Sequence, residues 1–129
     1  MDDGTAIQVW NRACELMDAG ASADAREGDL LLMHAIALDG AVQANGVVDA
    51  LESDDAETGI AGMRWLGLRE AAELLDRTRR RLATAVSDDD REVIEEEAST
   101  AYYSISTEEQ MTAGLAERLR TDADEFLPL

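Results

Sequence analysis

The side chains that most often carry out catalysis are scarce in this sequence. It contains one histidine, His34, within an apolar run, and one cysteine, Cys14, among the apolar residues of a predicted helix. It has no glycine-rich phosphate loop, and a metal site or a di-iron site would need histidines that the chain lacks. Residues 88–90 lack the alternating oxygen ligands and the glycine of a calcium loop. We therefore predict that the protein is not an enzyme and has no cofactor or metal. His34 and Cys14 are expected to be packing residues.

Carboxylates, in contrast, are abundant and gather in two clusters. In the first, acids recur every three or four residues along a predicted helix, which places them about 5–6 Å apart; this cluster consists of Asp88, Asp89, Glu92, Glu95 and Glu96. The second surrounds a predicted short helix and consists of Asp49, Glu52, Asp54, Asp55 and Glu57. We expect both clusters to bind a partner, and the sequence leaves open whether they share one face.

The net charge of the chain is its most extreme property. It contains 29 acidic residues and 11 basic ones, all arginine, for a formal charge of −18. Such a protein repels nucleic acid and attracts basic protein surfaces, so direct binding to DNA or RNA is not expected. A GC-rich genome or a salt-adapted proteome would produce much of the same composition without any specific partner, and this alternative stays open.

The charge can resemble that of DNA only if it is concentrated. A folded chain of 14.0 kDa exposes roughly 6,700 Å² by surface scaling, so 18 evenly spread charges amount to about one per 370 Å². Duplex DNA carries about one charge per 107 Å² of a cylinder roughly 20 Å wide. Evenly spread charge is thus more than threefold too dilute, and mimicry of DNA requires clustering on one face.

The elements that would position these acids are helices. Residues 29–45 form an almost continuously apolar run, which predicts a central helix buried by its neighbours. Asn45 and Gly46 tolerate the left-handed conformation that ends a helix, and a short helix follows at 47–51. Further helices are predicted at 5–19, 56–66 and 68–86, from residue 88, and from residue 107. At 129 residues without strand-like alternation, the chain is predicted to be a single all-α domain, a compact bundle of six to seven helices.

Several details of these helices can be tested against the structure. The helix at 68–86 is predicted to bury an apolar stripe that runs from Leu68 to Val86, and to expose a solvated basic face formed by Arg77, Arg79, Arg80 and Arg81. Ser87 is predicted to cap the next helix, and Thr107 with Gln110 to form a capping box. Residues 53–55 are predicted to cap the helix at 56–66. Phe126, Leu127 and Leu129 are expected to fold back onto the bundle.

Nothing in the sequence indicates export or membrane insertion. No run approaches the roughly 20 apolar residues of a membrane span. The N-terminal residues Met1–Gly4 are acidic where a signal peptide would be basic, and a single cysteine fits a reducing compartment. We therefore predict a cytoplasmic protein that does not bind membranes.

Five short segments resemble a family of small acidic all-helical bacterial proteins, catalogued as a domain of unknown function, that includes a DNA-mimic protein. They are LDGAVQANGVV at 38–48, MRWLGL at 63–68, AAELL at 71–75, AYY at 101–103 and TEE at 107–109. The family pattern has Asn-Gly-Gly-aromatic at the end of a helix. Asn45 and Gly46 match it, whereas Val47 and Val48 replace the second glycine and the aromatic residue. The resemblance implies a compact helical domain and, for at least one member, occupation of the DNA site of a regulatory protein.

Three functions are compatible with these features. The leading hypothesis is a non-enzymatic protein that binds a basic protein, as a DNA mimic occupying the DNA-binding site of a transcription factor or nucleoid protein. The second is an immunity-type inhibitor of a basic toxin or nuclease. The third is a structural protein whose acidity is only proteome background. The oligomeric state stays open, a homodimer included.

Overall fold

Helices make up all of the regular structure in the part of the chain that can be described. The structure is a computed structural model, and it describes residues 3–19, 24–54 and 56–128. Over these ranges it contains no strand, and its elements are α1 (Asp3–Ala19), α2 (Glu27–Asn45), α3 (Val47–Leu51), α4 (Ala56–Trp65), α5 (Arg69–Thr84), α6 (Asp88–Tyr103), α7 (Thr107–Thr121) and a short 3-10 turn, η1 (Ala123–Glu125). The predicted all-α fold is confirmed.

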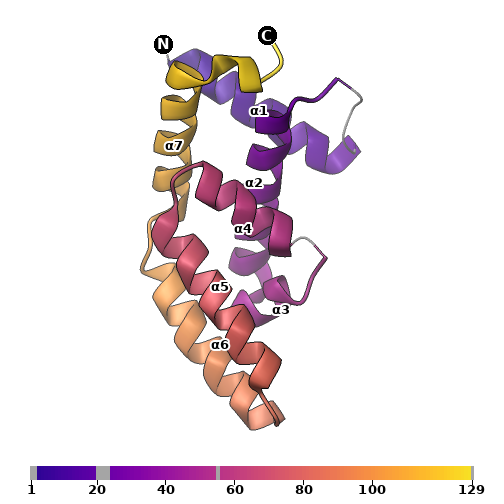
Figure 1. The fold of residues 1–129 in the computed structure, drawn as a ribbon, viewed down its shortest axis with the longest axis vertical. Coiled ribbons are helices and arrows are strands. Elements are labelled where there is room, and N and C mark those ends of the chain that lie inside the picture. Colours follow the sequence, from indigo (N-terminus) through magenta and orange to yellow (C-terminus); the bar gives the residue numbers. More distant parts are fainter. Residues whose placement is uncertain (1–2, 20–23, 55, 129) are drawn as a thin grey trace.

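The helices assemble into an elongated body with two different ends (Figure 1). One end holds α1, α7 and both termini of the chain. The other end holds α3 and the antiparallel pair α5 and α6, joined by a tight turn. Helix α2 runs along much of the long axis and connects the two ends. The charged residues of the first acidic cluster therefore lie at one end of the molecule.

Helix α2 is the central element, as predicted, but only one side of it is completely buried. Leu32, Ala35, Leu38 and Val42 lose all their solvent exposure at a spacing of three and four residues. The apolar residues between them, and His34, are half-buried. Helices α1, α3 and α4 pack on α2 and supply its cover.

Close contact between α2 and α4 depends on small residues in α4. A Cβ atom at Gly59 would overlap with the Leu38 side chain, and one at Gly62 would overlap with the carbonyl oxygen of Leu31. The two glycines therefore let the helix backbones approach more closely than any larger residue would allow.

A buried carboxylate joins three distant segments at the upper end of the molecule. Asp29 is 1% exposed, and its Oδ1 accepts a hydrogen bond of 2.8 Å from Arg12 Nη2 of α1. Its Oδ2 accepts hydrogen bonds from the backbone N–H groups of Arg26, at 3.0 Å, and Leu127, at 2.9 Å. Asp29 therefore holds α1, the start of α2 and the C-terminal segment together.

The C-terminal segment folds back onto the bundle as predicted for Phe126 and Leu127; Leu129 lies outside the described residues. Phe126 is buried and its ring lies 5.6 Å from that of Trp65. Arg118 lies over the Trp65 ring, with its guanidinium carbon 4.9 Å from the ring centroid. Aromatic packing and the bonds of Asp29 thus fasten the same segment.

Some helix ends differ from the predictions. Helix α2 begins at Glu27, two residues early, because the Asp29 carboxylate accepts the backbone N–H of Arg26. Helix α5 ends at Thr84, and Val86 is 90% exposed rather than part of the buried stripe. The capping by Ser87 is confirmed, since its Oγ accepts the backbone N–H of Asp90.

The capping box predicted at the start of α7 is wrong. Ser106 is the N-cap residue and makes no capping bond with its side chain. The Thr107 hydroxyl instead donates to Asp39 Oδ1 at 2.8 Å. Of the cap predicted at residues 53–55, Asp55 lies outside the described residues, and the Ser53 hydroxyl donates back to the Ala50 carbonyl oxygen.

The buried phenol of Tyr102 shares Asp39 Oδ1 with Thr107 as its hydrogen-bond acceptor. It is the largest fully buried side chain among the described residues, and its hydroxyl donates to Asp39 Oδ1 at 2.6 Å. Burial raises the pKa of the Tyr102 phenol above its ordinary value of about 10, and the hydrogen bond to Asp39 raises it further. The folded protein therefore keeps this proton to higher pH than the unfolded chain does.

This shift predicts a loss of stability in alkali. The contribution of Tyr102 is complete below about pH 10, where both states are protonated, and decreases above it by up to about 1.4 kcal/mol per pH unit. Urea unfolding between pH 8 and 11.5 should show this decrease, and Tyr102→Phe should lack it. Tyr103→Phe, which removes the hydroxyl of the exposed neighbour, should retain it. An identical alkaline decrease in Tyr102→Phe would contradict the assignment.

Candidate functional site

The structure brings the two acidic clusters together, because α3 lies against α6. The backbone N–H of Val48 donates to Glu95 Oε2 at 2.6 Å, and that of Val47 donates to Ser99 Oγ at 3.3 Å. An ion pair between Arg91 of α6 and Glu52, the C-cap residue of α3, joins the same two segments. Clusters separated by some 40 residues in the sequence are thus neighbours at one end of the molecule.

The Asn45-Gly46 turn determines how α3 meets α6. Gly46 has φ +91°, a conformation that favours glycine, and it directs the next two backbone N–H groups toward α6. A Cβ atom at this position would overlap with Glu95 Oε1. A carboxylate at the first turn of a helix also complements the positive end of the helix dipole. The conformation of Gly46 therefore allows α3 to dock on α6.

Glu95 was predicted to bind a partner, but its carboxylate makes hydrogen bonds inside the molecule. It is half-buried, with Oε2 bound to Val48 and Oε1 accepting the Ser99 hydroxyl at 2.8 Å. The helix period places Glu95 on the side of α6 that faces α3, so its carboxylate is used inside the molecule. It supports the charged surface and contributes little exposed charge to it.

The remaining acids of both clusters are exposed, except that Asp55 lies outside the described residues. We define the acidic face as the exposed acids of α3 and of the α6 flank beside it: Asp49, Glu52, Asp88, Asp89, Glu92 and Glu96. Asp54 and Glu57, also exposed, extend it along the chain toward α4. Glu52 is the member that is paired with an arginine.

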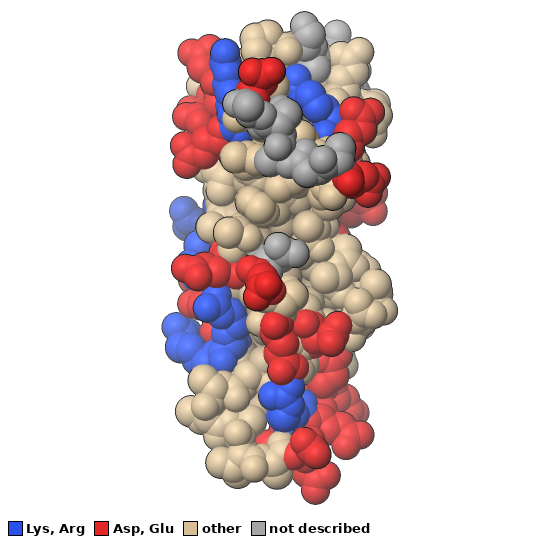
Figure 2. All heavy atoms as spheres, turned by 90° about the vertical axis from the view of Figure 1, so that its right-hand side faces the viewer, with Lys and Arg blue, Asp and Glu red and all other residues tan. Residues whose placement is uncertain are grey.

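Figure 2 shows where these charges gather. Acidic side chains cover much of the lower part of this view, where Figure 1 places α3 and the lower half of α6. Basic side chains group to one side of them in the same view. Asp88, Glu92 and Glu96 follow one another at intervals of four residues, each step rising about 6 Å along the helix axis. The acids thus form a row along α6 beside the acids of α3.

Clustering raises the charge density in this region to about twice that of an even spread. The described residues expose 7328 Å², so an even spread of 18 charges would give about one per 410 Å². Residues 47–54 and 88–103 contain ten acids and one arginine, a net charge of −9, which is half of the total in 24 residues. Glu95 is bonded inside the molecule and Glu97 pairs with Arg81 of α5, so the other acids and Arg91 leave a net charge of −7. If these residues expose an average share of the surface, roughly 1,400 Å², they carry about one charge per 200 Å², against about 107 Å² for duplex DNA.

The described part of the chain can also be examined for metal binding, a reactive thiol and a membrane-spanning helix. No three His, Cys, Asp or Glu side chains there converge as a metal ion would need. Burial raises the pKa of the Cys14 thiol, and the charge of Asp18 adds to this, so the reactive thiolate is disfavoured. Within the described ranges, no helix has both the length and the apolar character that crossing a membrane requires.

Sequence reasoning missed three features of this region. Arg91 was not singled out, although it is the cation that joins α3 to α6. Ser99 was also missed; its spacing of four residues from Glu95 was the available signal, since i, i+4 side chains are neighbours on a helix. The third is a pocket lined by arginines of α5 on the other side of α6.

Comparison with known proteins found no match for this chain among protein families, curated proteins or solved structures. The fold and the surface define it as an acidic all-helical protein with half of its net charge concentrated around two adjoining helices.

Proposed function

We propose that this is a non-enzymatic cytoplasmic protein that binds the basic surface of another protein through the acidic face. The observation that supports the proposal is the juxtaposition of α3 and α6, which places both acidic clusters beside each other. A surface with about one charge per 200 Å² attracts a basic partner at low ionic strength and repels nucleic acid.

We further propose that the surface it covers is a DNA-binding site. A basic surface that evolved for DNA is complementary to dense negative charge, and the acidic face has about half the charge density of duplex DNA. The row along α6 alone, with one charge per about 6 Å, is sparser than a DNA strand with one per 3.4 Å. Asp49 of α3 and Glu52, its C-cap residue, add charge beside this row. The resemblance to a family with a DNA-mimic member supports the same function.

The test is affinity capture with competition by DNA. The protein is immobilised and exposed to a lysate of the organism that encodes it, and bound proteins are eluted with duplex DNA. Glu92→Arg with Glu96→Arg reverses two charges of the acidic face without altering the Glu95 bonds. Glu70→Arg with Glu73→Arg makes the same change in charge at exposed positions of α5 and is the matched control.

We expect duplex DNA to release a basic protein that the control retains and the Glu92/Glu96 variant loses. Purified, this partner should bind at least about tenfold more weakly at 300 mM than at 50 mM NaCl, because salt screens exposed charges. A partner lost from the variant but not displaced by DNA would refute mimicry and favour a different basic target, such as a toxin. A partner that both variants retain equally would refute the acidic face as the binding surface.

A further inference from the structure

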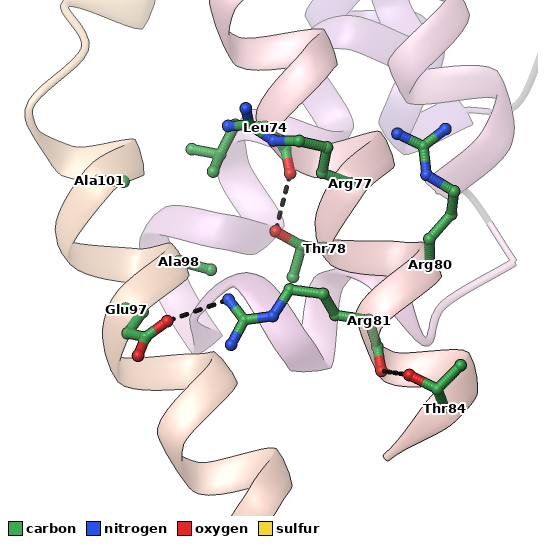
Figure 3. Close-up of a pocket in the computed structure, with 9 residues that line it drawn as sticks. All are labelled: Leu74, Arg77, Thr78, Arg80, Arg81, Thr84, Glu97, Ala98 and Ala101. Atoms are coloured by element: carbon green, nitrogen blue, oxygen red, sulfur yellow. Dashed lines mark hydrogen bonds and ion pairs between the residues drawn. The ribbon is translucent and has the colours of Figure 1, made fainter.

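A pocket lined by arginines lies on the side of α6 opposite the acidic face, where α6 packs against α5 (Figure 3). It is a surface depression of about 580 Å³. Figure 3 shows Arg77 and Arg81 reaching from α5 toward α6, whereas Arg80 points away from α6 and pairs with Asp76. Leu74, Ala98 and Ala101 supply apolar and small surfaces around it.

The two arginines differ in how they are neutralised. Arg81 Nη1 pairs with Glu97 Oε2 at 3.0 Å across the two helices. Arg77 has no carboxylate within ion-pair distance among the described residues, although the chain has 29 acids and Glu73 lies four residues earlier in the favourable order. Arg77 and Arg81 lie one helical turn apart and line the same pocket, so an uncompensated guanidinium and one that holds a carboxylate flank the space where an anion would bind.

We propose that Arg77 and Arg81 bind a small phosphate monoester. A guanidinium presents several donors in one plane, and a phosphate dianion has three oxygens that two such groups can share. Ala98 and Ala101 leave room above α6, and together with Leu74 they suit an apolar group esterified to the phosphate. An extended polyanion is disfavoured, because the net charge of −18 of the whole chain repels it.

Glu97 is the internal competitor for this site. Its carboxylate is half-exposed and bound to Arg81, so the ligand displaces it into solvent when it engages both arginines. Binding therefore exchanges the ion pair between α5 and α6 for contacts with the ligand. This site is independent of the acidic face, and failure of one proposal leaves the other standing.

The experiment is a titration of the full-length, ¹⁵N-labelled protein with phenyl phosphate, and separately with inorganic phosphate, at pH 7.5 and constant ionic strength. Saturable shifts of the backbone amides at residues 77–84 and 97–101 are expected for both probes, with tighter binding of phenyl phosphate. Arg77→Gln should weaken binding about tenfold through loss of a charge-assisted contact. Arg69→Gln, the same change at an exposed position of α5, should leave the affinity within about twofold.

A variant that binds phenyl phosphate more tightly cannot be explained by damage to the fold. Glu97→Gln removes the competitor and should strengthen phenyl phosphate binding about threefold or more. Glu96→Gln makes the same change in net charge on another side of α6 and should have a smaller effect. Shifts that do not saturate, or equal losses in Arg77→Gln and Arg69→Gln, would overturn the site. Equal affinity for both probes would overturn the part assigned to the apolar group.

Discussion

Asp29→Ala should destabilise the protein more than any other single substitution considered, by about 3–5 kcal/mol, because it leaves Arg12 without its buried partner. The change also removes the acceptor for two backbone N–H groups, those of Arg26 and Leu127. The loss is large compared with the roughly 5–15 kcal/mol that stabilises a typical domain. Urea unfolding followed by circular dichroism would measure it as a lower midpoint.

Two further variants make this result interpretable. Asp24→Ala removes one negative charge at an exposed position and should change the stability by less than about 0.5 kcal/mol. Asp29→Asn retains an acceptor oxygen and should cost less than Asp29→Ala. A loss below about 1 kcal/mol for Asp29→Ala would show that the carboxylate does not fasten the three segments.

Gly46→Ala should be the second most damaging change, with a loss of about 2–4 kcal/mol. The backbone conformation at Gly46, φ +91° and ψ 169°, is one that essentially only glycine adopts, and forcing another residue into it costs about 1–3 kcal/mol. The added methyl group would also overlap with Glu95 Oε1 and disturb the bond that docks α3 on α6. The same urea measurement applies, and chemical shifts of Val47 and Val48 would report the displacement of α3.

Gly40→Ala is the matched control for this prediction. Gly40 lies inside α2, and a Cβ atom there would meet nothing within 4 Å. Alanine should therefore stabilise the helix by about 0.5–1 kcal/mol. Substitutions of the same kind six residues apart are thus expected to act in opposite directions. Equal effects would mean that the turn conformation does not govern the stability of this region.

If α3 is displaced in Gly46→Ala, binding of a basic partner should weaken as well. Asp49 and Glu52 would no longer lie beside the acids of α6, although no exposed charge has been removed. A variant that stays folded but binds less tightly would link the geometry of the turn to the proposed function. Measured with the purified partner, this result would separate the arrangement of the charges from their number.

Much of the local structure could be predicted because it depends on neighbouring residues alone. The period of the apolar residues identified the helices, and Gly46, which has a positive φ, lies at the turn that was expected. Ser87 and its capping bond also follow from a few adjacent residues. The net charge and its local clusters are properties of composition and spacing, which folding does not alter.

The directions of long polar side chains could not be predicted in the same way. Asp29 was only an interruption of an apolar run, yet its partners include Leu127, 98 residues away. Glu95 was expected to be exposed, but it accepts a bond from Val48, 47 residues away. Arg77 was expected as one member of a solvated basic face, and the structure shows its exposed side chain reaching toward α6. In each case a partner distant in the sequence, or the lack of one, determines the role of the residue.

The sequence by itself thus determined the class of this protein: all-helical, strongly acidic and poor in catalytic side chains. Helix periodicity and total charge depend on local order and composition, so they can be obtained without knowing the fold. Only the tertiary structure decided that α3 and α6 adjoin, which places half of the net charge in one region. Adjacency of this kind results from packing between segments some 40 residues apart, and no local pattern specifies which flanks of two helices will meet.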